Sequence, residues 1–257
     1  MTGRSPASLL LGVDAAVSGA LGIANVRHRS ALHRLRIPAS VDIAAIVHRV
    51  IAANWIAGRA SENKDRSRQN WRWTLQPQIS GANRSPEVIL ERAIASACAA
   101  AGRSDWANQI PVSSGLIKGA SDGRRAADLA RRKNDGAYEL IELKIASDTP
   151  LYAAVELLGY ASLWLLARTD PPATNPALLA AKRLDLRVLA PAPFYSSFKL
   201  ESLERVIDDG ARSLVKAESV QLSFCFDVLP TAIAATSPPS GETLLSELAG
   251  RHRLHSR

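Results

Sequence analysis

Three charged residues, Asp128, Glu142 and Lys144, have the types and the spacing to do chemistry together. Side chains alternate along a strand, so Glu142 and Lys144 would share one face of the segment 137–146. A hairpin that pairs Asp128 with Glu142 would gather two carboxylates and one ammonium group on that face. The opposite face of the same segment is apolar and consists of Ile141, Leu143 and Ile145.

The residues between Asp128 and Glu142 predict such a hairpin. Two strand-like runs, 124–132 and 137–146, flank a loop that ends in Gly136, and a three-residue loop ending in glycine is a common hairpin connection. Gly136 would take the left-handed conformation, because it has no Cβ to clash there. This loop pairs Lys133 with Ala137, and the same register places Asp128 directly opposite Glu142.

A plainer interpretation of these charges is a solvated strand face, in which Asp128 is a cross-strand partner of modest value. A second Glu-x-Lys triplet, formed by Glu62 and Lys64, has the same spacing as Glu142 and Lys144. That triplet lies in polar sequence with no alternation, whereas Glu142 lies in the most strand-like segment of the chain. This context favours the functional interpretation.

The order of Asp128, then Glu142-Leu143-Lys144 on the next strand, then a helix from about Pro150, resembles the core of the PD-(D/E)XK nucleases. The resemblance covers about residues 85–195. Two positions depart from the family pattern. Ala127 stands where many members have proline, and Glu156, four residues before Tyr160, stands where RecB-like members have glutamine.

The resemblance implies a metal-dependent site in which Asp128, Glu142 and the Leu143 carbonyl bind Mg²⁺ or Mn²⁺ through oxygen. Lys144 would orient the attacking water or stabilise the developing negative charge. Glu156 and Tyr160 share one face of the following helix, where they would support Lys144.

The first core helix of the family often adds a glutamate to the metal site. Here a helix is predicted from Ser85, a suitable N-cap, and Pro86 at its first position, to about residue 101. Glu91 is the first candidate and Glu87 the second. Either acid could instead be an exposed helix charge, and Glu87 would also be favourable at a helix N-terminus.

A formal net charge of +8 favours a polyanionic partner. Five cations lie near the two acids and would suit phosphate neutralisation, although they could equally keep an edge hairpin soluble. The predicted partner is nucleic acid, DNA favoured over RNA, with a homodimer possible because many relatives dimerise. The five cations are Arg124, Arg125, Arg131, Arg132 and Lys133.

The elements that must position these residues predict an α/β fold. Helices are expected over 41–58, 85–101, 151–167 and 198–216, and strands over 105–118, 184–189 and 220–228, in addition to the hairpin. With the resemblance, this order predicts a restriction-endonuclease-like sandwich, a central mixed β-sheet flanked by helices. The predicted organisation is a flexible N-terminal arm over 1–40, the nuclease-like domain over 41–230, and a linker with a C-terminal tail over 231–257.

Other kinds of site are disfavoured by the composition. Cys98 and Cys225 are far apart, so neither a disulfide framework nor a metal-thiolate spacing is available. The five histidines lie near the two ends of the chain and form no ligand cluster. No apolar stretch reaches the length of a membrane span without interruption. We therefore expect a cytoplasmic protein without a membrane partner.

These observations predict a metal-dependent nuclease that hydrolyses phosphodiester bonds. The alternative is a catalytically inactive nuclease-fold protein that acts as a nucleic-acid-binding or structural module. An active site would be stabilised by Mg²⁺, whereas a simple basic binder would not.

Overall fold

The computed structural model describes residues 8–33, 35–79, 82–117, 125–134, 136–230 and 237–255. The strands in these ranges are β1 (Trp106–Pro111), β2 (Ala126–Asn134), β3 (Ala137–Leu143), β4 (Arg183–Pro191), β5 (Gln221–Leu229) and β6 (His252–Arg253). They form one sheet in the order β1-β2-β3-β4-β5-β6. The pairings of β4 with β3 and with β5 are parallel and the other three are antiparallel, so the sheet is mixed as predicted.

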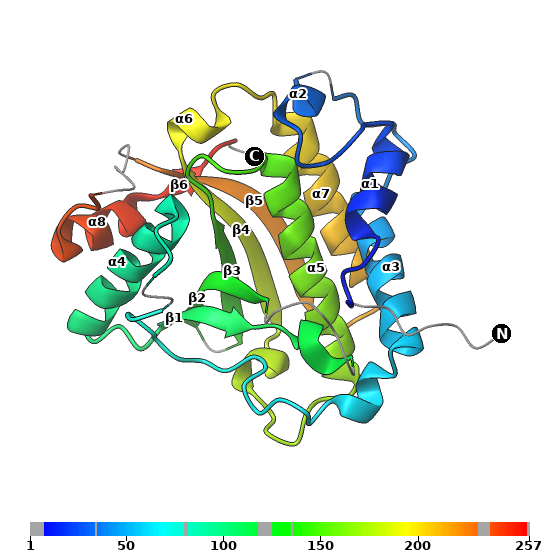
Figure 1. The fold of residues 1–257 in the computed structure, drawn as a ribbon, viewed down its shortest axis with the longest axis horizontal. Coiled ribbons are helices and arrows are strands. Elements are labelled where there is room, and N and C mark those ends of the chain that lie inside the picture. The colour runs from blue at the N-terminus through cyan, green and yellow to red at the C-terminus, as the bar shows by residue number, and fades with distance from the viewer. Residues whose placement is uncertain are drawn as a thin grey trace.

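Helices cover both faces of this sheet (Figure 1). One face carries α4 (Pro86–Ala100) and α8 (Gly241–Gly250). The other carries α5 (Pro150–Thr169) and α7 (Glu201–Leu214), on which α3 (Ile43–Ala57) packs as an outer layer, with α1 (Val13–Leu21) packed on α3. The α/β sandwich predicted from the sequence is therefore confirmed at this level. The shorter helical elements are α2 (Arg29–Leu32), α6 (Ala192–Tyr195), and the 3₁₀ helices η1 (Ala60–Asn63), η2 (Ser113–Leu116) and η3 (Ala177–Ala180).

The apolar core is divided by the sheet into two parts. The larger part packs against α5, whose Leu157, Leu163 and Trp164 are fully buried. The smaller part lies between the sheet and the pair α4 and α8, and includes Ile94 and Leu244. By length and composition α5 could cross a membrane, but most of it is buried inside the protein, where apolar composition is expected of a core helix.

The caps that start α4 and α5 fix where the two helices meet the sheet. The Ser85 hydroxyl accepts from the Val88 N–H at 3.4 Å, and Pro86 is the first residue of α4, as predicted. The Thr149 hydroxyl accepts from the Tyr152 N–H at 3.0 Å, while its own hydrogen is donated to the Val26 carbonyl at 2.6 Å. The start of α5 is thus tied both to its own backbone and to the N-terminal segment.

The predicted loose arm over residues 1–40 is corrected by the structure. Val13, Val17 and Leu21 on α1 are buried in the larger core, together with Val26 after the helix. Glycines and Asp14 interrupt this segment, so it has no long apolar run. Its few apolar residues nevertheless line one side of a helix that packs on α3.

The predicted tail over residues 231–257 is corrected as well, although part of it lies outside the described residues. Leu244 and Leu248 of α8 are buried against the smaller core, and β6 pairs with β5 through Val228 and His252. The segment from 241 to 255 therefore belongs to the fold.

Candidate active site

The hairpin of β2 and β3 has the predicted register over most of its length. Leu129 pairs with Ile141, so the next step along the ladder places Asp128 opposite Glu142. The carboxylate of Asp128 accepts a hydrogen bond from the Leu143 N–H at 2.8 Å. Asp128 is therefore held against the end of β3, beside Glu142.

The loop of the hairpin differs from the prediction by one residue. Asn134, rather than Lys133, pairs with Ala137, and the register shifts between Arg132 and Asn134. Gly136 has the expected left-handed conformation with φ 84°. Because the irregularity is confined to the turn, the register at Asp128 is unaffected.

Lys144 is buried among carboxylates immediately after β3. Its Nζ lies 3.0 Å from Glu142 Oε1, 3.1 Å from Glu156 Oε2 and 3.9 Å from Asp148 Oδ2. Burial alone would lower the pKa of Lys144, but the charges of Glu142, Glu156 and Asp128 outweigh it and raise the pKa above its usual value. Lys144 is thus a fixed positive charge, and the predicted contact with Glu156 is present.

The two carboxylates of the hairpin are difficult to ionise together. Burial raises the pKa of Asp128 to about 6, against the opposing effects of Lys144 and the Leu143 N–H. Burial also raises the pKa of Glu142, and the charges of Asp128 and Glu156 raise it further. Removing one charge or adding a cation would relieve this crowding.

Glu91 reaches the same region from α4. Its carboxylate accepts from the Asn108 amide at 2.9 Å and from the Gln109 amide at 3.0 and 2.9 Å. Burial, followed by the charge of Asp128, raises the pKa of Glu91 to about 8. Glu91, the first candidate from this helix, therefore lies within electrostatic range of Asp128 but is already held by two amides.

Glu87, the second candidate from α4, holds the chain that follows Lys144. Its Oε1 accepts from the Ile145 N–H at 3.2 Å and from the Ser147 hydroxyl at 2.7 Å. Burial would raise the pKa of Glu87, but the Ser147 hydroxyl and nearby backbone N–H groups lower it. Its contacts suit a residue that positions the loop rather than a metal ligand.

Glu156 and Tyr160 approach from α5, as the helical spacing predicted. Glu156 bridges two cations, because its Oε1 lies 3.5 Å from Arg125 Nη1 while its Oε2 contacts Lys144. Tyr160 is buried, and burial followed by the charges of Glu142 and Glu156 raises its pKa well above the usual value. Both residues therefore lie on the α5 side of Lys144.

The oxygens that remain for a divalent cation are those of Asp128, Glu142 and the Leu143 carbonyl. Glu142 Oε2 is buried without a hydrogen-bond partner among the described residues. The Leu143 carbonyl points toward β2 and Asp128, as the Leu143 N–H does, because the N–H and C=O groups of one strand residue point to the same side of the strand. Within the described ranges, no three His, Cys, Asp or Glu side chains are arranged to hold a metal. Mg²⁺ is commonly bound by one or two carboxylates with water and phosphate, so this pair fits it.

The predicted phosphate-binding cations are not all brought to this site. Arg125 lies there, and Arg124 lies outside the described residues. Arg131 pairs with Asp105 at 3.5 Å, Arg132 is exposed, and Lys133 lies 3.6 Å from Glu139. At about 3.3 Å per residue, Lys133 is roughly 17 Å along the strand from Asp128. These three cations belong to the opposite end of the hairpin.

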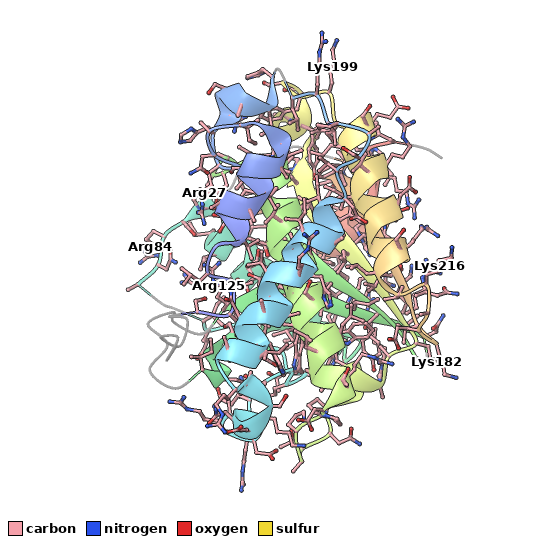
Figure 2. The ribbon with its side chains drawn as sticks, turned by 90° about the vertical axis from the view of Figure 1, so that its right-hand side faces the viewer. Arg27, Arg84, Arg125, Lys182, Lys199 and Lys216 are labelled. Atoms are coloured by element: carbon pink, nitrogen blue, oxygen red, sulfur yellow. The ribbon has the colours of Figure 1, made fainter. Side chains whose placement is uncertain are left out.

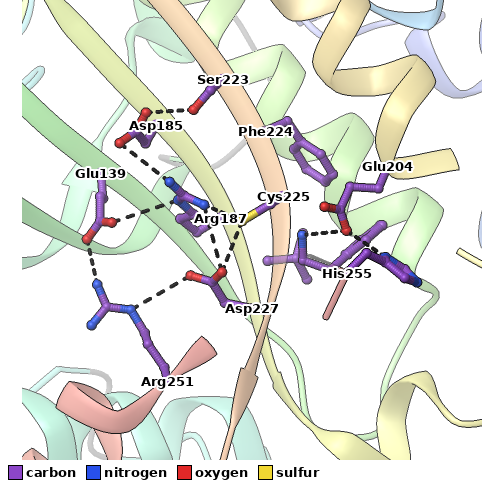
Figure 3. A network of polar contacts seen from close by, with 12 residues as sticks. Glu139, Asp185, Arg187, Glu204, Ser223, Phe224, Cys225, Asp227, Arg251 and His255 are labelled. Atoms are coloured by element: carbon purple, nitrogen blue, oxygen red, sulfur yellow. Dashed lines mark hydrogen bonds and ion pairs between the residues drawn. The ribbon is translucent and has the colours of Figure 1, made fainter. Parts of the chain in front are cut away.

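A second group of buried charges lies on the sheet face that α4 and α8 partly cover (Figure 3). Arg187 on β4 lies 3.5 Å from Asp185 and 3.8 Å from both Glu139 and Asp227. Arg251 pairs with Glu139 at 2.7 Å and lies 3.8 Å from Asp227. The alternation of residues in β3 predicted an apolar face here. The charged side chains that β4 and β5 place on the same face were not predicted.

Four further residues lie next to Lys144 and Glu91 and were not among the predicted site residues. Asn108 and Gln109 hold Glu91, and Gln109 does so from a left-handed backbone conformation with φ 47°. Such strain in a non-glycine residue often accompanies a functional site. Arg27 and Tyr152 contact each other across 125 residues, and Lys144 Nζ lies 5.7 Å from the Tyr152 ring centre.

Comparison with known proteins returned no matching family model, no matching curated protein and no matching solved structure.

Proposed function

We propose that this chain is a metal-dependent nuclease that hydrolyses phosphodiester bonds, with DNA favoured over RNA as the substrate. The observation that carries the proposal is the meeting of Asp128, Glu142 and Lys144 at one end of a hairpin. Glu142 and Lys144 are buried, and one oxygen of Glu142 has no partner among the described residues. A cluster with more carboxylates than cations is costly without a further cation.

Each residue has a distinct part in this proposal. Asp128 and Glu142 would hold Mg²⁺ or Mn²⁺, which supplies an activated water and stabilises charge on the phosphate. Lys144 stays protonated at neutral pH, because the neighbouring acids hold its pKa above the usual value. Its ammonium group can therefore stabilise negative charge as the phosphate is attacked. Glu156 fixes the position of that ammonium group.

The restriction-endonuclease-like fold is part of the same proposal. Two features support it: an antiparallel hairpin that carries the acids, and a parallel β3-α5-β4 unit directly after it. This order places Lys144 between the end of β3 and the start of α5. The α/β sandwich itself is compatible with many functions, so the proposal depends on the site.

The test is cleavage of plasmid, linear duplex, single-stranded DNA and RNA with Mg²⁺ or Mn²⁺, comparing the wild type with Lys144→Ala. A matched control is Lys64→Ala, which removes the lysine of the other Glu-x-Lys triplet. We expect metal-dependent cleavage that falls by at least about 100-fold in Lys144→Ala and is unchanged in Lys64→Ala.

Two results would contradict this proposal. Cleavage that survives in Lys144→Ala would place the activity elsewhere. Absence of cleavage of all four substrates, with no change in melting temperature on adding metal, would favour the catalytically inactive nucleic-acid-binding or structural module.

A further inference from the structure

A cavity of about 440 Å³ lies between the N-terminal segment and α5. Its volume is within the range of sites that bind small molecules. The segment 8–15 forms one side, and Tyr152, Val155 and Glu156 form the other. The cavity thus depends on a part of the chain outside the segment, 85–195, that resembles a nuclease core.

This cavity shares a wall with the candidate active site. Glu156 lines it, and the same carboxylate contacts Lys144 at 3.1 Å. Asp148 links the two sites a second way, because it lies 3.9 Å from Lys144 and 3.7 Å from Arg27, which also lines the cavity. A molecule in the cavity would therefore be one side chain away from Lys144.

Two guanidinium groups face the cavity from the same side of the molecule, next to α1 (Figure 2). Arg27 stacks over the Tyr152 ring, 3.6 Å from its centre, and pairs with Asp14 at 3.3 Å. Arg125 pairs with Glu156. Arginine has five N–H donors, so these pairings leave donors for a phosphate.

The start of α1 adds further donors and an apolar surface. Gly12 precedes the helix with φ 85°, and no side chain caps the first turn, whose residues line the cavity. The Val13 N–H donates to the Leu10 carbonyl at 3.2 Å, and the other N–H groups of the first turn favour negative atoms. Leu11 also lines the cavity and is 54% exposed, and Ile56 is the other large apolar side chain that is strongly exposed among the described residues.

We infer that this cavity binds one unpaired nucleotide of the substrate, next to the bond that is cut; the inference rests on the proposed nuclease function. Arg27, Arg125 and the start of α1 bind the phosphate, and the base packs on Leu10 and Leu11. Asp14, Asp148 and Glu156 pair with the two arginines, so the electrostatic attraction for phosphate is weak and the contacts to the base must contribute to the affinity. Because the site takes a single unpaired base, the preferred substrate has a single-stranded end or gap.

Binding is tested without metal, in a chelating buffer, so that it is separated from cleavage. The probes are a short labelled single-stranded DNA and the same sequence closed into a hairpin duplex. Base stacking and apolar contacts contribute on the order of 1–3 kcal/mol per base, so we expect roughly tenfold tighter binding of the single strand. Inorganic phosphate should compete only weakly, because it lacks the base that packs on Leu10 and Leu11.

The key variant is Leu11→Asp, with Ile56→Asp as its matched control on the other exposed apolar residue. Leu11→Asp should weaken single-strand binding roughly tenfold and leave hairpin binding unchanged, while Ile56→Asp changes neither. Arg27→Gln provides a second variant with the same expected loss, should Leu11→Asp fail to fold by its melting curve.

The outcomes separate this inference from the proposed function. Wild-type binding that Leu11→Asp and Arg27→Gln both weaken, without cleavage in Mg²⁺ or Mn²⁺, would support the nucleotide site and overturn the nuclease. Cleavage with equal single-strand binding in wild type and both variants would support the nuclease and overturn the nucleotide site. Equal binding of the single strand and the hairpin duplex by the wild type would also overturn the nucleotide site.

Discussion

The two groups of buried charges differ in how their charges balance. Around Lys144 and Asp128, six carboxylates face four cations: Glu87, Glu91, Asp128, Glu142, Asp148 and Glu156 against Lys144, Arg125, Arg27 and Arg92. On the opposite face of the sheet, Glu139, Asp185 and Asp227 face Arg183, Arg187, Arg251 and Lys133.

The pKa shifts follow this difference except at Asp227, whose pKa is raised by burial against the opposing effects of Arg187 and Arg251. In the first group, burial and neighbouring acids raise the pKa values of Asp128, Glu142 and Glu91. In the second, burial would raise the pKa of Asp185, but Ser223 and Arg183 lower it. The second group is therefore neutralised by its own cations, whereas the first keeps an excess of acid that a divalent cation would neutralise. The unbalanced cluster is therefore the better candidate of the two for a functional site.

The largest expected effect is on stability, from Arg187→Ala in the balanced group. Arg187 is only 4% exposed and is shared by three carboxylates. Its removal would leave those acids short of a buried partner, which costs about 3–5 kcal/mol of unfolding free energy. Urea unfolding monitored by circular dichroism would measure the loss.

Arg183→Ala is the control for this prediction, since Arg183 also contacts Asp185 but its side chain is 45% exposed. Its loss should cost less than about 1 kcal/mol. Equal costs for the two variants would mean that Arg187 does not organise the second group, and the contrast between the groups would fail.

The next effect is stabilisation by Mg²⁺, which should act on the unbalanced group alone. At a free concentration of about 100 times Kd, binding to the native state adds roughly 2.7 kcal/mol. We expect the melting temperature of the wild type to rise with Mg²⁺ and that of Glu142→Gln to stay constant. Glu139→Gln, the matched change in the balanced group, should keep the rise. A rise retained in Glu142→Gln would exclude Glu142 as a ligand.

Local sequence was sufficient to predict the hairpin that carries Asp128 and Glu142. A loop ending in Gly136 and the alternation of β3 fix the register, and neither depends on distant residues. The helix start at Ser85 could be located for the same reason, since caps are local. Glu91 and Glu156 then followed from helical spacing together with the family resemblance.

The missed features depend on contacts between distant parts of the chain. Arg251 meets Glu139 across 112 residues, and Arg27 meets Tyr152 across 125. No periodicity encodes either contact. The left-handed conformation of Gln109 is equally invisible, because glutamine has no preference for it. The N-terminal segment was taken for an arm because its apolar residues become informative only when α3 and α5 are in place.

The smallest effect is a pH dependence of stability that distinguishes the two acids of α4. The pKa of Glu91 is raised from an ordinary value near 4.5 to about 8 in the folded state, so the unfolded chain releases this proton first. The contribution of Glu91 to stability is complete at low pH and is lost as the pH rises from the unfolded pKa to the folded pKa. The free energy of unfolding should fall by roughly 2 kcal/mol between about pH 5.5 and 7.5. Glu91→Gln should remove that loss in urea unfolding with chelator present. Glu87 has a lowered pKa, so its contribution is present above the unfolded pKa and is lost only at more acidic pH. Glu87→Gln should therefore shift stability by a constant amount over the same window. Parallel curves for Glu91→Gln and the wild type would show that Glu91 ionises normally, so that it carries a negative charge beside Asp128 at neutral pH.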